Sequence, residues 1–409
     1  MSNALPPTQL SVVTLKRGES DRIVAGHPWV YDGTIASVRP RPADGDAVWV
    51  RDVKGRQLGT GLWNSKSKIL VRVLAAEKVE INTAFFTDRI QSALTLRRRA
   101  LPATNSFRVV NAEGDFLSGL IVDKYEDVLV LQTSALGMDQ RKHEIVAVLQ
   151  ELFAPRAVVE RNDISSRRLE GLPEQVGVLA GALAGPVTVT LNGLRFAVDP
   201  LGGHKTGLYL DQQVNQRLVA ELIARTPGAR VLDAFSFIGG FGLAAAQAGA
   251  ASVYLLDQSE EALAAARQHA QANGLTDRCS FEAVNVFDWL KARTAVGTNE
   301  KLIPPFDAVI LDPPSFTRNR AAVPDALRGY KEIHVRALKL VKSGGLLATF
   351  CCSHHVDPVT FQDVILSAAF DTRRLLRRVA VFTQAPDHPI IPSIPETEYL
   401  KGFAFEVVR

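Results

Sequence analysis

The sequence predicts an α/β protein whose C-terminal part forms a doubly wound parallel sheet, preceded by a small β-rich domain and a central α+β domain. From about residue 191 onward, strand-like and helix-like segments alternate, which is typical of a parallel sheet covered by helices on both faces. Residues 11–76 instead contain short β segments separated by glycine-containing turns. The length of 409 residues suits two or three domains.

The composition is that of an ordinary globular protein, with 46% apolar and 22% charged residues. The most apolar stretch, residues 176–191, is broken by glycines and is shorter than the roughly 20 residues that span a bilayer. Three cysteines cannot form a disulfide framework, and the first residues do not resemble a signal peptide. We therefore predict a cytoplasmic protein. Its net charge of +4 permits a polyanionic partner without requiring one.

The N-terminal β domain, predicted over residues 1–77, mixes cations with aromatic side chains. Such a mixture can hold a nucleic-acid backbone and stack on a base. A solvated face is an equally weighted alternative. The candidate RNA contacts are Arg17, Arg22, His27 and Trp29, and the predicted strands include residues 11–15, 47–52 and 69–74.

The central domain, predicted over residues 78–190, begins with a helix over residues 81–100 that ends in Arg97, Arg98 and Arg99. We expect these cations to be solvated and to complement the helix dipole, with RNA binding as the less favoured alternative for them and for the nearby Arg167 and Arg168. Strands at 119–123 and 127–132 are expected to pair, followed by one long helix over residues 139–153.

A third domain is predicted over residues 191–409. Its strands are expected at residues 230–234, 252–257, 307–312 and 345–350, and its helices include 259–273 and 323–342. Ligands of such sheets bind at the carboxyl ends of the strands. The residues that follow each strand are therefore the candidates for a binding site.

The first of these strands runs into a glycine-rich turn that contains Phe235, Gly239 and Gly240. The turn is not a G-x-G-x-x-G motif, and an acid at the strand end, Asp233, would repel a pyrophosphate. Acids are also predicted at the ends of the next two strands, namely Asp257 and Asp288. Helix caps explain each acid alone about as well. Three such acids without a phosphate cradle predict S-adenosylmethionine, a cationic nucleoside, as the cofactor.

The chemistry is predicted to lie at the ends of the next two strands. One strand ends in Asp312-Pro313-Pro314-Ser315-Phe316 and the other in Cys351-Cys352. Carbon 5 of cytosine is a poor nucleophile, and a thiolate that adds to carbon 6 activates it, which requires a cysteine beside the methyl donor. Since side chains alternate along a strand, only one of the two cysteines should face the site. A buried, inert cysteine is the common alternative, and no metal site is predicted.

Three segments carry a resemblance to the RlmI-type family of 23S rRNA cytosine-5 methyltransferases, and the resemblance covers essentially the whole chain. They are Gly26-His27-Pro28-Trp29, residues 119–123 and residues 205–213. The resemblance implies a PUA domain at the N terminus, a central α+β domain and a Rossmann-like methyltransferase domain. These three domains match the three predicted segments.

The resemblance also implies roles for individual residues. The family's Ser-Cys-Ser pattern falls on Cys351-Cys352-Ser353, which makes Cys352 the nucleophile and leaves Cys351 facing away. Ser315 stands where another branch carries a second cysteine, so single-cysteine chemistry is implied, with Asp312 binding the N3/N4 edge of the cytosine. The implied cofactor site adds Tyr209, Asp211, Gln212 and Asp312, and the implied RNA site adds Pro314 and Phe316.

The expected partner is 23S rRNA, either free or in an immature subunit, with no membrane partner; the oligomeric state is left open, with a homodimer as one alternative. An enzyme of the same architecture that methylates another atom, such as N2 of guanine, is the nearest competing hypothesis. An NAD-dependent dehydrogenase is disfavoured by the missing dinucleotide fingerprint. A noncatalytic rRNA-binding assembly factor is the alternative from another class. Ile238 also departs from the family, which often has threonine there.

Overall fold

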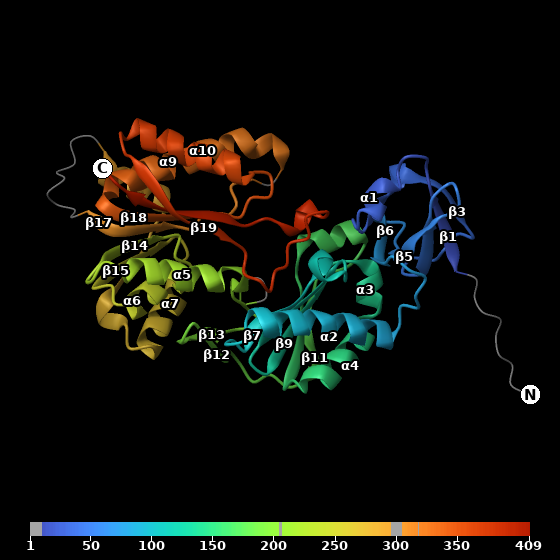
Figure 1. Cartoon of the computed structure of the whole chain (residues 1–409). Helices are drawn as coiled ribbons and strands as arrows, with labels where there is room; N and C mark the ends of the chain where they lie inside the picture. Colours follow the sequence, from blue (N-terminus) through green and yellow to red (C-terminus); the bar gives the residue numbers. More distant parts are fainter. Residues whose placement is uncertain (1–9, 204–206, 296–304, 318) are drawn as a thin grey trace, which may run out of the picture. The chain divides into compact units, whose positions relative to one another are not determined.

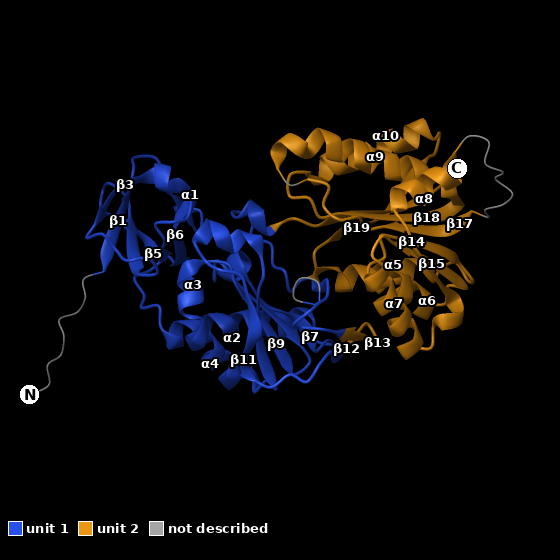
Figure 2. Ribbon diagram, turned by 180° about the vertical axis from the view of Figure 1, so that it is seen from behind, with its two compact units in different colours: residues 1–189, 198–210, 386–397 blue, residues 190–197, 211–385, 398–409 orange. Residues whose placement is uncertain are grey.

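The structure is a computed structural model that describes residues 10–203, 207–295, 305–317 and 319–409. The chain divides into two compact units (Figure 2). Unit 1 comprises Met1–Val189, Val198–Leu210 and Pro386–Thr397, and unit 2 comprises Thr190–Ala197, Asp211–Ala385 and Glu398–Arg409. Lys205 and Thr206 of the family motif and the first nine residues lie outside the described residues. Neither unit is one continuous stretch of chain.

Unit 1 starts with a six-stranded sheet in the order β2-β6-β5-β4-β1-β3. Buried and half-buried residues alternate along β1 and β4, and their buried valines form a small core with Val71 of β6. The predicted strands at residues 11–15, 47–52 and 69–74 are confirmed as β1, β4 and β6. The elements are β1 Ser11–Leu15, α1 Asp21–Val24, β2 Trp29–Tyr31, β3 Ile35–Arg39, β4 Ala47–Arg51, β5 Gln57–Trp63 and β6 Ile69–Ala75.

The second part of unit 1 is a five-stranded sheet in the order β11-β10-β9-β8-β7, with β8 and β9 paired as predicted. The predicted helix over residues 139–153 is wrong in one respect, because the chain leaves the helical conformation at Arg141. The Arg141 guanidinium donates to the carbonyls of Gly45 and Gly137 there. The elements are α2 Thr83–Ala100, β7 Ser106–Asn111, β8 Leu120–Tyr125, β9 Val128–Thr133, α3 Leu136–Gln140, α4 Lys142–Phe153, β10 Ala157–Asn162 and β11 Gln175–Gly181.

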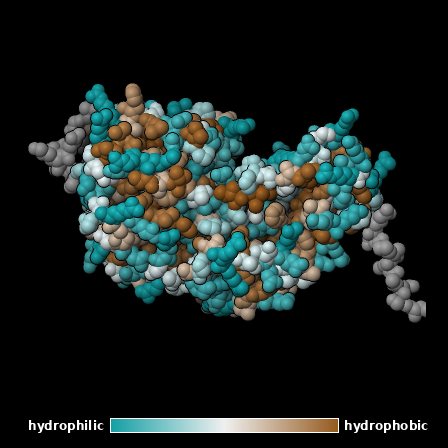
Figure 3. Space-filling model, in the orientation of Figure 1, coloured by the Kyte–Doolittle hydropathy of each residue, from teal (hydrophilic) through white to brown (hydrophobic). Residues whose placement is uncertain are grey.

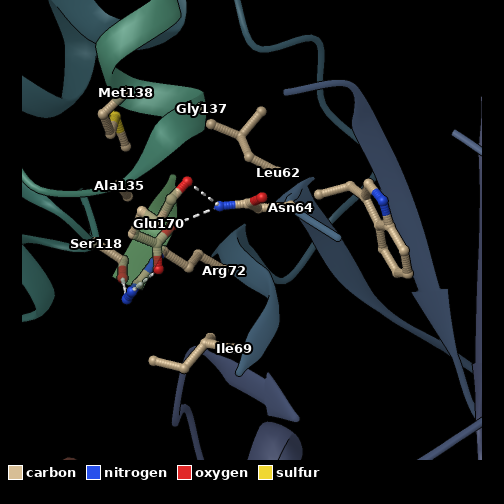
Figure 4. Close-up of a pocket in the computed structure, with 10 residues that line it drawn as sticks. Leu62, Asn64, Ile69, Arg72, Ser118, Ala135, Gly137, Met138 and Glu170 are labelled. Carbon is tan, nitrogen blue, oxygen red and sulfur yellow. Dashed lines mark hydrogen bonds and ion pairs between the residues drawn. The ribbon is translucent and has the colours of Figure 1, made fainter. Parts of the chain in front are cut away.

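A polar cluster joins these two parts of unit 1 around a cavity of about 10 Å³ (Figure 4). The Asn64 amide donates to the Glu170 carboxylate at 2.9 Å, and Arg72 donates to the same carboxylate at 2.9 Å. Burial alone would raise the pKa of Glu170, but the Arg72 charge and the hydrogen bonds outweigh it and lower that pKa. The charged form of Glu170 is therefore the one that holds the two sheets together.

Arg97 and Arg167 are fully buried, so the expectation that they are solvated is wrong. The Arg97 guanidinium donates to both carboxylate oxygens of Asp115, at 2.5 and 2.6 Å, and to the backbone carbonyls of Arg108 and Asp387. A buried charge is tolerated when its donors are paired in this way. Arg97 thereby connects α2, β7 and the 386–397 segment within unit 1.

Unit 2 is built on a seven-stranded sheet in the order β16-β15-β14-β17-β18-β20-β19. Its first five strands are parallel and β20 is antiparallel to both of its neighbours. A two-stranded hairpin of β12 Val187–Leu191 and β13 Leu194–Val198 precedes it. The strands are β14 Arg230–Ala234, β15 Ser252–Asp257, β16 Cys279–Ala283, β17 Phe306–Leu311, β18 Val341–Cys351, β19 Leu376–Thr383 and β20 Lys401–Val407.

Helices cover both faces of this sheet, as predicted (Figure 1). Helix α9 contacts both α8 and α10 on one face, where Figure 2 labels all three, while α5, α6 and α7 lie on the other. A core cluster of unit 2 packs α8, α9 and α10 against the central strands. The helices are α5 Gln213–Ile223, α6 Gly240–Gln247, α7 Glu260–Ala272, α8 Val286–Thr294, α9 Val323–Leu340 and α10 Pro358–Asp371.

The surface of unit 2 carries apolar side chains on α10 and on the edge strand β19 (Figure 3). Phe370 is 84% exposed, and Val359, Leu366 and Val381 are exposed as well. No helix within the described part of the chain combines the length and the hydropathy that crossing a bilayer requires.

Replacing Arg97 with Met is expected to destabilise unit 1 by about 3–5 kcal/mol, because the buried Asp115 carboxylate loses its cation. Amide hydrogen exchange in α2 and β7 measures this loss separately from unit 2. Arg98→Met is the matched control, since Arg98 is the exposed neighbour on the same helix, and it should change stability by no more than about 0.5 kcal/mol. Equal protection in the two variants would contradict a structural role for the buried guanidinium.

Candidate active site

The parallel strands of unit 2 end at one edge of the sheet. Ala234 of β14 pairs with Leu256 of β15 and Leu311 of β17, and Leu311 in turn pairs with Thr349 of β18. The residues just beyond these positions therefore lie along a single edge. The structure brings four of the predicted residues to it, namely Asp233, Asp257, Asp312 and Cys352.

The turn after β14 has an unusual backbone. Phe235 and Phe237 have φ values of 69° and 50°, in the left-handed region that non-glycine residues rarely adopt, and Gly239 follows at 89°. A β-carbon on Gly242 would approach the Asp233 carboxylate to 2.9 Å, so only glycine fits there. Strained residues of this kind cluster at ligand sites, where the backbone must come close to the ligand.

Asp233 is buried beneath this turn. Its Oδ2 accepts the Gly242 amide at 2.7 Å, whereas its Oδ1 has no hydrogen-bond partner among the described residues, and neither has the buried hydroxyl of Ser236. Burial raises the pKa of Asp233 to about 7. An acid with one unpartnered oxygen and a penalised negative charge fits a cationic ligand that brings its own donors.

Asp257 ends β15 as predicted, and its carboxylate accepts the amides of Phe237 and Ser259 at 2.8 and 2.9 Å. It thus fixes the turn after β14 from the neighbouring strand. The prediction that Asp288 ends the third strand is wrong, because β16 ends at Ala283. Asn285 caps α8 instead and places Asp288 in the first helical turn, exposed.

Asp312 follows β17 and both of its oxygens lie 3.2 Å from the side-chain amide nitrogen of Gln212. The Gln212 oxygen in turn accepts from Asn215 at 2.7 Å. Asp211 is also buried, with Oδ2 accepting the Tyr399 hydroxyl at 2.6 Å and Oδ1 without a partner among the described residues. Asp211 Oδ1 is thus a second buried oxygen near this edge that lacks a hydrogen-bond donor among the described residues. The remaining residue of the implied set, Tyr209, belongs to unit 1 and is 38% exposed.

The two cysteines differ in exposure as predicted. Cys351 is the last residue of β18 and is fully buried in the core, whereas Cys352 lies just past the strand and is half-buried. The Cys352 sulfur lies 3.9 Å from the Pro313 carbonyl, which makes it a neighbour of the Asp312-Pro313 turn. Pro314 is exposed in this turn, and Phe316 packs against Tyr330 with ring centroids 4.5 Å apart.

The predicted RNA contacts of the first sheet lie in unit 1 and have varied surroundings. Arg17 is exposed. His27 is 1% exposed and shares the carboxylate of Glu396 with Arg22, at 3.0 and 3.1 Å. The Trp29 indole donates to Glu113 at 3.0 Å. Three of the four side chains therefore make contacts inside unit 1, and a role in RNA binding stays a prediction for all four.

Several polar residues near the strand edge were not predicted from the sequence. They are Ser236, Asn215, Tyr330, Ser353, Tyr399 and Lys401. Ser236 lies inside the glycine-rich turn, where a hydroxyl could have drawn attention. The others come from helix α5, helix α9 and the C-terminal strands, and only the folded chain brings them together.

A family model described as S-adenosylmethionine-dependent methyltransferase matches residues 174–393, and one described as a PUA-like domain matches residues 13–76. The chain is thus a Rossmann-like class I methyltransferase that uses S-adenosylmethionine, as the sequence predicted. Proteins named ribosomal RNA large subunit methyltransferase I are 39% identical over 400 residues in Shewanella amazonensis and 38% over 405 residues in Vibrio vulnificus. Each match covers 97% of this chain and 99% or more of the relative. The chain belongs to the ribosomal RNA large subunit methyltransferase I family.

Solved structures agree on the fold. A protein assigned as a methyltransferase and solved in complex with SAH aligns with a TM-score of 0.81 at 21% identity, over 98% of this chain and all of the other. One assigned as an S-adenosylmethionine-dependent methyltransferase from Streptococcus mutans aligns with a TM-score of 0.79 at 20% identity, with the same coverage. The predicted α/β fold class, with an N-terminal PUA-like domain and a Rossmann-like methyltransferase domain, is therefore confirmed.

The affinity for S-adenosylmethionine is expected to rise roughly eightfold between pH 6 and pH 7.5. The pKa of Asp233 is raised to about 7, so most of its carboxyl is neutral at pH 6 and most is charged at pH 7.5, and only the charged form complements the cationic ligand. Calorimetric titration at both pH values measures the change. Asp233→Asn should bind more weakly at pH 7.5 and show a flat response. A wild type with pH-independent affinity would contradict this assignment.

Proposed function

We propose that the chain methylates carbon 5 of a cytosine in large-subunit 23S rRNA, through a covalent bond between Cys352 and carbon 6. The observation that carries the proposal is the half-buried Cys352, which follows β18 and lies against the Asp312-Pro313 turn at the edge where β14, the strand that contains Asp233, also ends. The names of the full-length relatives support rRNA as the substrate, and the match to a PUA-like model supports an RNA partner. The proposal places the reaction in the cytoplasm.

The proposed cofactor contacts are Asp233, Ser236 and the turn from Phe235 to Gly240, with Asp257 holding that turn in place. Their unpartnered oxygens suit the donors of S-adenosylmethionine. When bound, S-adenosylmethionine supplies an electrophilic methyl group on a sulfonium. Asp211 and Gln212 extend the proposed site, since both are buried, with Asp211 beside Tyr399 and Gln212 beside Asp312. Tyr209 and Asp288, which are both exposed, complete the set of proposed cofactor contacts.

The proposed step at the cysteine begins with the thiolate, which adds to carbon 6 of the cytosine and breaks the carbon 5–carbon 6 double bond. The electron pair moved to carbon 5 would form the new bond to the methyl group, while the sulfur–methyl bond of the donor would break with its electron pair left on sulfur, so that SAH would be the leaving group. Loss of the proton from carbon 5 then re-forms the double bond and expels the thiolate. Asp312 is proposed to bind the N3/N4 edge of the base and stabilise the adduct, while Pro314 and Phe316 contact the flanking RNA.

Two alternatives are distinguished by the product. If the chain methylated N2 of guanine, Cys352 would be passive and the product would be a methylated guanosine. If it were an assembly factor without activity, rRNA would bind and no methylated nucleoside would form. Ser315 before Phe316 favours the cytosine assignment, because amino methyltransferases usually place an aromatic residue directly after the two prolines. Whether the chain forms a homodimer stays a prediction.

The test uses tritiated methyl donor, protein-free rRNA or immature subunits, and mass spectrometry of the nucleosides. Wild type should yield 5-methylcytidine, and Cys352→Ala should lose on the order of a thousandfold or more in rate, because it removes the nucleophile. Cys351→Ser is the matched control, since it alters the buried neighbouring thiol and should retain most of the activity. A fully active Cys352→Ala variant or a product on another base would overturn the proposal.

A further inference from the structure

Lys401 is a buried cation beside the loop that carries Cys352. It is the first residue of β20 and only 8% exposed. Its ammonium donates to the backbone carbonyls of Ser353 and Val356, at 2.6 and 2.7 Å. Among the residues that the structure describes, no carboxylate lies within ion-pair distance of this ammonium. Lys401 therefore enters the protein interior with neutral oxygens as its hydrogen-bond partners.

The sheet register explains how Lys401 reaches this position. Lys401 pairs with Cys351 across the antiparallel β18–β20 ladder, so its backbone lies level with the end of β18. The two carbonyls that it binds flank the turn immediately after Cys352. Lys401 thus fixes the segment between Cys352 and α10, and its ammonium binds the carbonyl of the residue that directly follows Cys352.

Among the negatively charged groups near Lys401, the two cysteines affect its pKa most. Burial lowers the pKa of Lys401, and the charges of Cys351 and Cys352 act in the opposite direction, ahead of the weaker effects of Glu398 and Asp357. The Asp357 carboxylate already accepts the amide and hydroxyl of Thr360.

From α9, the Tyr330 hydroxyl lies 3.1 Å from the Ser353 hydroxyl, and burial raises the pKa of this tyrosine, which keeps it neutral. His354 lies in the loop itself, with its ring 5.5 Å from that of Tyr399. Cys351 is the other thiol at this point, but it is enclosed in the core. Of the two thiols at this point, Cys352 is therefore the accessible one, while the Asp312 carboxylate at the same edge lies beside the Gln212 amide.

We propose that Lys401 is the positioning residue that orients the Cys352 loop and stabilises the Cys352 thiolate. This inference rests on the proposed function, in which Cys352 is the nucleophile. A free cysteine has a pKa near 8.5 and is mostly protonated at neutral pH, whereas a nearby lysine favours the thiolate. The buried ammonium and the thiolate each offset the cost of burying the other. A thiolate on the loop that the ammonium binds would explain why a lysine is kept in the interior without a carboxylate.

The test measures the thiolate directly and needs neither RNA nor turnover. In a Cys279→Ser, Cys351→Ser background, iodoacetamide alkylation of Cys352 is followed by mass spectrometry from pH 5.5 to pH 9.5. With Lys401 present, Cys352 should react with a midpoint about one pH unit lower than in Lys401→Gln, which corresponds to roughly tenfold faster alkylation at pH 7. Lys401→Gln keeps a donor for the carbonyls but lacks the charge, so a purely structural role would leave the midpoint unchanged.

Lys401→Arg serves as the second variant, because it restores the charge and should return the midpoint toward that of the background protein. Loss of folding would instead speed alkylation at all pH values, in the opposite direction to the expected slowing. Equal midpoints with Lys, Gln and Arg at position 401 would overturn the inference. The alkylation experiment is independent of the activity test. If the Lys401 variants share one midpoint while Cys352→Ala is inactive, only the role of Lys401 is refuted. If the midpoints differ while Cys352→Ala remains active, only the role of Cys352 as the nucleophile is refuted.

Discussion

The candidate site depends on the shared register of the parallel strands in unit 2. Ala234, Leu256, Leu311 and Thr349 lie level with one another, so four chain segments that are far apart in sequence turn away from the sheet at one edge. The apolar core between α9, α10 and these strands holds that register, because a one-residue slip would turn buried side chains toward the opposite face. Every polar group at the edge inherits its position from this packing.

The edge also concentrates unfavourable features. Three kinds of feature each cost free energy in the folded chain, on the order of 1–3 kcal/mol apiece. They are the two phenylalanines in left-handed conformations, the oxygens of Asp233 and Asp211 without a partner among the described residues, and the buried ammonium of Lys401. They are compensated by the surrounding core rather than by one another. Such a distribution is characteristic of a surface shaped for a ligand, since the ligand supplies the missing hydrogen bonds and charges when it binds. Stability and function are thus separated in space within unit 2.

Most of the fold and part of the site could be predicted from the sequence, because both depend on local patterns. Short β segments between turns located β1, the alternation of strand-like and helix-like segments located β15, and an acid near the end of a strand located Asp233 and Asp257. The failures share a cause. Asp288 was misplaced because Asn285, three residues earlier, caps a helix that the strand pattern did not reveal. Arg97 was taken as solvated because its partners lie outside its helix, the Asp115 carboxylate 18 positions away and the Asp387 carbonyl 290 positions away. Lys401 and Tyr399 were missed for the same reason, since their roles arise from long-range pairing that no periodicity encodes.

The path of the chain between β19 and β20 has a consequence for synthesis. Residues 386–397 leave unit 2 to complete unit 1, and Asp387 supplies one of the carbonyls around the buried Arg97 guanidinium. A nascent chain emerging from the ribosome therefore cannot close the Arg97 site when the first 210 residues have been made; it must wait until almost the whole polypeptide has been translated. The N-terminal unit is completed only once residues 386–397 have been made, shortly before β20 completes unit 2, so the order of translation couples the maturation of the two units.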